Sequence, residues 1–416
     1  MTAEVPSLSP WTCPFCSLLC DGFVPDPGQP ARLLGSDCPR AQAGLAAHLR
    51  TDGGRVEASI DGVACTMDDA VAAAAQRLAR WRQPLFGGLG TDVSGARALY
   101  RLAARCQAIC DHADGAALMH GVRAVQDRGQ YTTTLGEVAD RADLIVCVGT
   151  AAIPRYPEFF RRCGLGRPAS PCRCLVFLSV PPPAEVPPGL EVHAVPGSGD
   201  LFADVQQLAA CVEGGRGGPH DPALVALAAR LQAARYAVRV WESGVLARHG
   251  ELVVEALGRI VAALNRQTRA ATLALGGSDG AATVNQVFTW LSGLPLRTRI
   301  APAGLVHEPL RFDGERLIAR GAVDGLLWIS SFDPARRPRA AAVPRVVLGP
   351  PAMALHLREV SALADCVFMP VATPGLDAAG HLFRTDGSIV VPLAALRQSG
   401  LPAVSAVLAG IEEKLP

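Results

Sequence analysis

The sequence of 416 residues predicts an α/β protein with parallel sheets and flanking helices. Short runs of apolar and β-branched residues end at glycine or proline, and segments of helical periodicity lie between several of them. Parallel strands need a long crossover, which is usually a helix, so this alternation favours parallel pairing. A chain of this length is long enough for two or three domains with a large core.

The first regular elements are predicted by turn and cap signals. Asp61 and Gly62 separate two short alternating runs, which is a strong hairpin pattern. Thr66, with Asp69 three residues later, is a variant of the capping box and should begin an alanine-rich helix. The stretch QPLFGGLG then reads as an apolar strand that runs into glycines, and SGARALYRLAARCQAIC as the helix after it.

The later elements continue the same alternation. We expect further strands in RADLIVCVG, RCLVFLSV, LEVHAV, ARYAVRVW, AATLALGG, DGLLWISS, RVVLG and CVFMPV. Helical periods lie in DLFADVQQLAACV, LVVEALGRIVAALNRQ and TVNQVFTWLSG. The glycine-rich segment 214–222 is the most obvious linker. We therefore expect a cysteine-rich module with a hairpin over 1–65, an α/β lobe over 66–213, and a second α/β lobe with a C-terminal tail over 223–416.

Composition excludes several classes of function. Lys and Arg number 39 against 38 Asp and Glu, a formal charge of +1, so the basic field that nucleic-acid binding needs is missing. No apolar run is long enough for a membrane span. The N-terminus lacks the pattern of a signal peptide, which favours a cytoplasmic location. In a large chain that is not exported, 13 cysteines indicate metal ligands or free thiols rather than disulfides.

Four cysteines near the N-terminus form the most specific motif. Cys13, Cys16, Cys20 and Cys38 are spaced C-x2-C-x3-C-x17-C. Iron–sulfur clusters are held by four thiolates from such short runs plus a distant ligand, so a 4Fe–4S cluster is the leading interpretation. Zinc also binds four thiolates, but usually through two paired knuckles, and here Cys38 stands alone. A zinc site and a site without metal remain as alternatives.

Other candidate residues are more simply explained by packing. LFGGLGTDVSG follows a strand and precedes a helix, so its N–H groups are candidates to cradle a phosphate, but it lacks the dinucleotide spacing and a P-loop lysine. We interpret it as a tight turn, and the segment 307–321 as a solvated surface loop. Arginines that are weak candidates for a phosphate contact are Arg155, Arg161 and Arg162. Residues expected to pack at strand ends are Asp143, His193 and Trp241. Cysteines expected to act as small core residues are Cys106, Cys110, Cys147, Cys163, Cys172, Cys174, Cys211 and Cys366.

Four segments along the chain resemble the B subunit of formylmethanofuran dehydrogenase, a member of the molybdopterin oxidoreductase superfamily. They are CPFCSLLCDG, the long stretch from MHGVRAVQDRGQ to PRYPEFF, VNQVFTWLSGLP, and VATPGLDAAGHLFRTDGSIV. The resemblance implies a fold like domains 1–3 of formate dehydrogenase and DMSO reductase. It also implies a 4Fe–4S cluster on the cysteine quartet and a pterin cofactor carrying tungsten or molybdenum.

Two departures from that family pattern bear on activity. The family has Cys-His-Gly at its metal, where this chain has Met119, His120 and Gly121. A neutral thioether is a weak ligand for an oxidised metal that a thiolate holds strongly. The family also has an arginine that faces substrate, where Gly276 stands here and offers no guanidinium. We therefore assign no catalytic residue, treat His120 as a possible remnant, and expect tungsto- or molybdopterin to be absent.

One branch of the resemblance matches these losses. GLGTDVSGARAL in particular resembles the B subunit of the bacterial formyltransferase/hydrolase complex of one-carbon metabolism in methylotrophs. That relationship implies a non-redox structural role, with an amidohydrolase-like A subunit, a C subunit and a formyltransferase subunit as partners. The complex would take the formyl group of formyl-tetrahydromethanopterin to formate. The alternative is an active tungsten or molybdenum B subunit of formylmethanofuran dehydrogenase, with the metal held by pterin dithiolenes alone.

Overall fold

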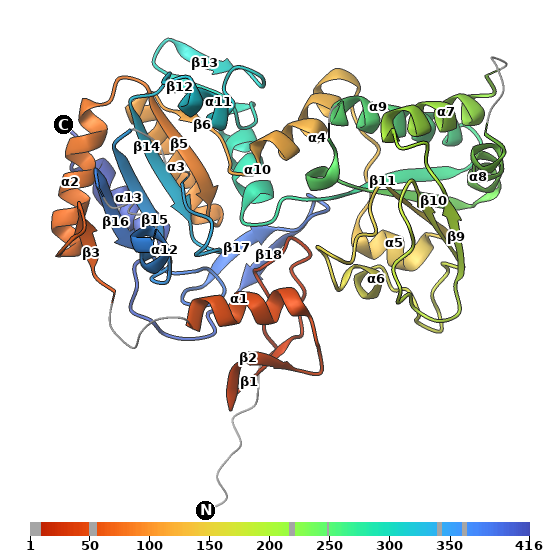
Figure 1. Ribbon diagram of the computed structural model, residues 1–416, viewed down its shortest axis with the longest axis horizontal. Coiled ribbons are helices and arrows are strands. Elements are labelled where there is room, and N and C mark those ends of the chain that lie inside the picture. The colour runs from red at the N-terminus through yellow and green to blue at the C-terminus, as the bar shows by residue number, and fades with distance from the viewer. Residues whose placement is uncertain (1–9, 50–55, 216–220, 248, 339–342, 360–363) are drawn as a thin grey trace, which may run out of the picture. The chain divides into compact units, whose positions relative to one another are not determined.

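The computed structural model describes residues 10–49, 56–215, 221–247, 249–338, 343–359 and 364–416. It forms two compact units (Figure 1). Unit 1 combines Met1–Gly115 with Gly277–Pro416, and unit 2 is Ala116–Gly276. No helix in the described ranges is long and apolar enough to cross a membrane.

Unit 1 is built on a mixed sheet of nine strands, in the order β13-β12-β6-β5-β14-β15-β16-β3-β4. Its central strands are parallel: β5 (Pro84–Gly90), β6 (Ile109–Cys110), β14 (Gly325–Ser330), β15 (Arg345–Gly349) and β16 (Cys366–Pro370). Antiparallel strands extend both edges: β3 (Ala58–Ile60), β4 (Val63–Cys65), β12 (Thr298–Ala301) and β13 (Gly304–His307). Two small hairpins lie outside the sheet: β1 (Val24–Asp26) with β2 (Gln29–Leu34), and β17 (Gly380–Phe383) with β18 (Val390–Leu393).

Seven helices in the described residues belong to unit 1. They are α1 (Pro39–Leu49), α2 (Met67–Arg80), α3 (Val93–Cys106), α10 (Ala281–Ser292), α11 (Gly314–Ala319), α12 (Met353–Glu359) and α13 (Val404–Glu413). Helix α13 packs between α2 and α3, and α3 also contacts α10. The C-terminal helix is thus part of the layer that covers the sheet.

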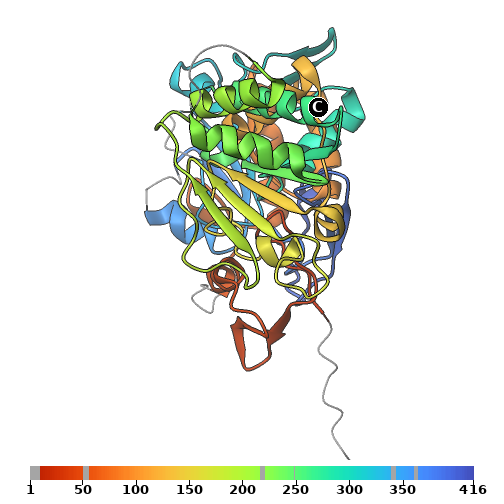
Figure 2. The same cartoon turned by 90° about the vertical axis from the view of Figure 1, so that its right-hand side faces the viewer.

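Unit 2 is a parallel sheet of five strands in the order β11-β10-β7-β8-β9. The strands are β7 (Leu144–Val148), β8 (Cys174–Leu178), β9 (Glu191–Val195), β10 (Tyr236–Glu242) and β11 (Arg269–Leu275). The helices are α4 (Gly115–Arg128), α5 (Leu135–Arg141), α6 (Phe159–Arg162), α7 (Leu201–Glu213), α8 (Pro222–Ala233) and α9 (Gly250–Leu264), with a 3-10 turn at Ser243–Val245. Figure 2 shows α7, α8 and α9 stacked over one face of the sheet, where their leucines and valines form one buried cluster with the strands.

The α/β class and the first local signals are confirmed. Asp61 and Gly62 connect β3 to β4 with φ of 51° and 85°, the positive values that a tight hairpin turn requires. Thr66 caps α2, because its hydroxyl accepts a hydrogen bond of 3.1 Å from the Asp69 amide. Five of the nine cysteines outside the quartet are buried, while Cys65, Cys106, Cys174 and Cys211 are half-buried.

The compact units differ from the lobes expected over 66–213 and 223–416. The chain leaves unit 1 after β6, builds all of unit 2, and returns to unit 1 at Gly277. The segment 214–222 instead joins α7 to α8, which pack against each other within unit 2, and residues 216–220 lie outside the described residues. The segment 307–321 is not a simple surface loop, since it contains α11, which Asp313 caps through the Arg316 amide.

The strand orders place one switch point in each sheet. In unit 2, β7 leads on to β8 and β9 on one side, whereas β10 leads to β11 on the other. In unit 1, β5 leads to β6 and β14 leads to β15 and β16 in opposite directions. Ligands of open α/β sheets bind outside the carboxyl ends of the strands at such points. A ligand site is therefore expected at the ends of β7 and β10, or at the ends of β5 and β14.

Candidate functional site

The predicted quartet of thiols comes from one loop and the start of α1. Cys13, Cys16 and Cys20 lie before β1, Cys38 immediately precedes α1, and all four side chains are buried. The Cys13 amide donates to the Cys20 carbonyl at 3.0 Å, and Leu19 closes a tight turn with φ of 44°. The loop thus folds back on itself and brings distant thiols inside.

The electrostatics of the quartet keep its thiols neutral unless a cation compensates the charge of the thiolates. Burial raises the pKa of the Cys13 thiol well above its usual value, and the sulfurs of Cys16, Cys20 and Cys38 raise it further. Burial also raises the pKa of Cys16 to about 11. Because the other three sulfurs each raise the pKa of the Cys13 thiol, the four side chains lie together in one site. Several thiolates are stable together in such a site only when a metal ion or cluster compensates their charge.

Four thiols are a donor set for either a single zinc ion or an iron–sulfur cluster, and the two differ in the spacing of the sulfurs. A tetrahedral zinc with bonds of about 2.3 Å brings its sulfurs to within about 3.8 Å of one another. No three sulfurs of the quartet lie within 4.8 Å of one another in the described part of the chain. A 4Fe–4S cluster spreads its four thiolates over different irons and holds them farther apart.

The cysteine module is fixed to the body of unit 1. The Trp11 indole donates to the Gly375 carbonyl at 2.6 Å, and the Ser17 amide donates to the Ser278 hydroxyl at 3.3 Å. Helix α1 lies close against the loop, since a Cβ on Gly44 would come within 2.4 Å of the Phe15 ring. Ser278 belongs to the turn beside the switch point of unit 1, so the module and that point are neighbours.

The switch point of unit 1 is closely packed. Asp92 caps α3 with its own carboxylate, which accepts from the Gly95 amide at 2.9 Å. Gly280 has φ of 79°, and a Cβ there would lie 2.6 Å from the Thr91 carbonyl oxygen. The LFGGLGTDVSG stretch is thus the tight turn that we predicted, with another turn of the chain directly against it.

A partly buried polar network lies on the other side of that turn. Arg336 pairs with Asp279 at 3.1 Å and with Asp114 at 2.7 Å. Burial raises the pKa of the Asp279 carboxyl, and the Arg336 guanidinium opposes that rise. The His112 Nδ1 accepts from the Asp114 amide at 2.9 Å, and Nε2 donates to the Asp279 carbonyl at 3.1 Å. Both ring nitrogens are therefore used by a neutral imidazole.

This network predicts a loss of stability in acid. Burial lowers the pKa of His112 from 6.5 to about 4. Between these values the unfolded chain binds the extra proton, so stability from this group is present above pH 6.5 and falls as the pH drops towards 4, by up to about 1.4 kcal/mol per unit. His112→Asn keeps an acceptor for the Asp114 amide, so its urea midpoint should change less over this range. His381→Asn, at an exposed site, is the control and should behave like the wild type.

In unit 2, Met119 and His120 have different surroundings on α4. Met119 is 3% exposed, so its thioether is buried. The His120 Nδ1 lies 3.4 Å from a Glu251 carboxylate oxygen, and the other oxygen of Glu251 pairs with Arg123 at 2.7 Å. Glu251 is in the first turn of α9. His120 thus makes a contact from α4 to α9.

Gly276 directly follows β11 in a confined position. A Cβ on Gly276 would lie 2.3 Å from the Ser243 hydroxyl, which follows β10. Ser243 in turn donates to the Leu275 carbonyl at 3.4 Å. A longer side chain at position 276 therefore requires Ser243 to move.

The switch point of unit 2 carries a buried carboxylate. Glu242 ends β10, is 2% exposed, and accepts a hydrogen bond of 2.7 Å from the Thr150 hydroxyl after β7. Its other oxygen pairs with Arg155 at 3.1 Å. Two of the arginines that were candidates for a phosphate contact are therefore in ion pairs. Arg155 pairs with Glu242, and Arg161 pairs with Glu158. Glu242 is not among the residues predicted from the sequence, although an acidic residue at the end of an apolar strand is a visible signal.

The strand-end candidates divide into two kinds. Asp143 accepts from the amides of Arg235 and Tyr236, both at 2.9 Å, and Trp241 is buried, as expected of packing residues. The His193 side chain is 30% exposed instead, and its Nε2 contacts Glu191 at 2.5 Å.

No family model matches the chain. The B subunit of the formyltransferase/hydrolase complex Fhc from Methylorubrum extorquens is 30% identical over 357 residues, which are 85% of this chain and 95% of that protein. The chain belongs to this B-subunit family. The X-ray crystal structure of the FhcABCD complex from the same organism, in complex with methylofuran, contains a chain that matches with a TM-score of 0.73 and 28% identity. The match covers 86% of this chain and 98% of that chain.

More distant relatives are metal enzymes. The B subunit of the tungsten-containing formylmethanofuran dehydrogenase 2 from Methanocaldococcus jannaschii is 25% identical over 65% of this chain and 66% of that protein. Its counterpart from Methanococcus maripaludis is 23% identical over 75% of each protein.

Proposed function

We propose that this chain is the non-redox structural B subunit of a cytoplasmic formyltransferase/hydrolase complex in one-carbon metabolism. Its partners are the amidohydrolase-like A subunit, the C subunit and the formyltransferase subunit. The complex transfers the formyl group from tetrahydromethanopterin and releases it as formate. Membership of the B-subunit family and the match to the FhcABCD structure support this assignment.

The observation that carries the non-redox part of the proposal is Met119. The resemblance places a cysteine thiolate here, as the protein ligand of tungsten or molybdenum. Met119 is buried and offers only a neutral thioether. Its neighbour His120 is engaged with Glu251, and a substrate-binding arginine is replaced by Gly276 in a confined position.

Both switch points also disfavour the pyrophosphate of a pterin dinucleotide. In a fold of the molybdopterin oxidoreductase type, which we propose for this chain, such phosphates need unblocked N–H groups and positive charge. At the switch point of unit 2, Glu242 is a buried carboxylate, and Arg155 beside it is paired with this carboxylate. In unit 1, Asp92 caps the helix that would otherwise receive a phosphate. The residues present do not fit the pterin cofactor.

In this proposal the cysteine quartet keeps its metal, whereas the pterin site is lost. Cys13, Cys16, Cys20 and Cys38 hold a 4Fe–4S cluster that stabilises the N-terminal module. Metal–thiolate bonds contribute directly to the folding of small modules with little core of their own. The cluster is retained for structure, since electron transfer has no purpose once the second metal is lost.

Replacement of His120 distinguishes the proposed function from the alternative of an active tungsten or molybdenum enzyme. If the chain were an active tungsten or molybdenum enzyme, His120 would lie beside the metal and its replacement would abolish turnover. In our account, His120→Gln in the purified complex keeps the rate of formate release within about twofold of the wild type. Its amide still reaches Glu251, so the bond between α4 and α9 is largely preserved.

Met119→Cys is the reciprocal test. We expect this variant to gain neither tungsten nor dye-linked formate oxidation, because Gly276 and Glu242 remain unsuited to substrate and cofactor. Loss of all formate release in His120→Gln, or a gain of redox turnover in Met119→Cys, would favour the alternative.

A further inference from the structure

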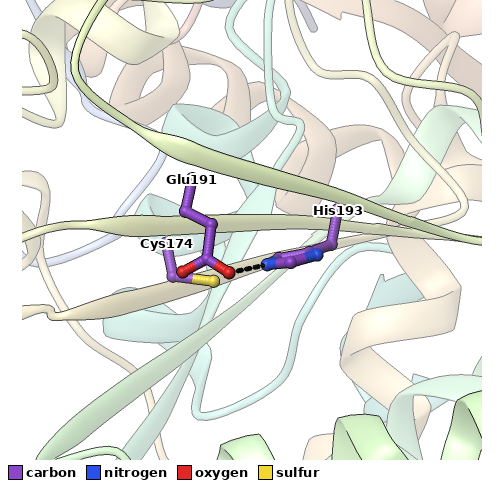
Figure 3. Close-up of side chains that lie close together, drawn as sticks. All are labelled: Cys174, Glu191 and His193. Carbon is purple, nitrogen blue, oxygen red and sulfur yellow. Dashed lines mark hydrogen bonds and ion pairs between the residues drawn. The ribbon is translucent and has the colours of Figure 1, made fainter.

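Three metal-binding side chains meet at the edge of the unit 2 sheet. Cys174 begins β8, and Glu191 and His193 lie on β9, the last strand of the sheet. Cys174 is in register with Glu191, and Val176 with His193. Residues two apart on a strand share a face, and so do residues in register on neighbouring strands. The pairing therefore places all three side chains on one face, as Figure 3 shows.

The three ligand atoms are close enough for one ion. The Cys174 sulfur, a Glu191 oxygen and a His193 nitrogen all lie within 4.8 Å of one another. Among the described residues, this is the one group of three that meets this limit. The side chains of Glu191 and His193 are 59% and 30% exposed, so an ion reaches the site from solvent.

We propose that Cys174, Glu191 and His193 bind a zinc-class divalent cation, with water in the fourth position. Sulfur, imidazole nitrogen and carboxylate oxygen are the donors that zinc takes in proteins, and three protein ligands with one open position are a known zinc arrangement. Magnesium and calcium prefer oxygen ligands alone, so this donor set selects against them.

Arg230 on α8 supplies a positive charge beside Glu191 and Cys174. Its guanidinium lies 3.5 Å from Glu191 and also hydrogen-bonds the Cys174 sulfur. A metal binds the thiolate form of cysteine, so binding releases the proton of Cys174. The Arg230 side chain is 43% exposed and can move into solvent. The ion thus displaces both the proton and the arginine.

The site is independent of the proposed function, since it shares no residue with the quartet or either switch point. A test must therefore separate it from the quartet, which also binds metal. Trypsin offers this separation, because no lysine or arginine lies between Arg173 and Arg216. One peptide, 174–216, therefore contains both Cys174 and Cys211. Cys211 lies on α7, is half-buried like Cys174, and has no metal ligand grouped with it among the described residues.

The experiment is alkylation of the full-length chain by iodoacetamide with and without added zinc chloride, followed by digestion and mass spectrometry of that peptide. We expect stoichiometric zinc to slow alkylation of Cys174 at least tenfold and to leave Cys211 within about twofold. His193→Ala should remove the protection. Arg230→Gln should lower the zinc concentration for half protection severalfold, because the competing cation is gone.

Two results would overturn this inference. One is equal alkylation of wild-type Cys174 with and without zinc, which needs no variant and so no assumption about folding. The other is protection that persists in His193→Ala. Neither result bears on the role of the chain in a formyltransferase/hydrolase complex.

Discussion

Cys38→Ser is expected to remove iron from the protein and to unfold the N-terminal module before the rest of unit 1. Cys38 is the only ligand of the quartet that follows the β1–β2 hairpin, so the cluster links both ends of residues 13–38. Without it, three buried sulfurs and the packing of apolar side chains such as Trp11, Phe15 and Leu18 remain, but the link between the two ends of the module is lost. We expect limited proteolysis to cut within residues 10–49 at least tenfold faster than in the wild type.

The control for this experiment is Cys211→Ser, which changes a half-buried thiol outside the quartet. It should keep its iron and its protease resistance. If wild-type protein prepared without oxygen contains no iron, and Cys38→Ser is equally resistant to protease, the quartet does not hold a cluster.

Gly280→Ala is expected to destabilise unit 1 by about 3 kcal/mol or more. Gly280 has φ of 79°, and an added Cβ would lie 2.6 Å and 2.8 Å from backbone atoms of Thr91. Backbone atoms cannot rotate away as a side chain does, so the turn must move off the end of β5. The midpoint of urea unfolding measures this loss.

Gly293→Ala is the matched control. Gly293 has φ of 78° at the end of α10, but nothing lies within 4 Å of an added Cβ. Its cost should be the conformational strain alone, about 1 kcal/mol. Equal losses in the two variants would show that the turn at Gly280 does not pack against the end of β5. The switch point of unit 1 would then no longer argue against a bound dinucleotide.

Local signals of the sequence predicted the local elements well. The hairpin at Asp61 and Gly62 and the cap at Thr66 depend on residues within a few positions of one another, so single-sequence reasoning is sufficient for them. The α/β class followed from the alternation of strands and helices. The spacing of the cysteines predicted a shared site, and the structure places all four inside unit 1.

Tertiary arrangements were harder to predict. The chain inserts unit 2 between β6 and the rest of unit 1, and composition shows no boundary at Gly115 or Gly277. The contact of Thr150, Glu242 and Arg155 joins two strand ends that only the sheet order brings together. The Cys174 site likewise depends on the register of β8 with β9, because Cys174 and Glu191 are distant in sequence.

The metal content of the complex purified from its native host, by mass spectrometry of the elements, tests the central claim most directly. The cysteine quartet predicts iron, about four atoms per copy of this chain from one cluster. Met119 and Glu242 predict tungsten and molybdenum only at trace level. Tungsten or molybdenum at about one atom per copy would contradict the account, because a redox metal would then be bound where we find no ligand for it.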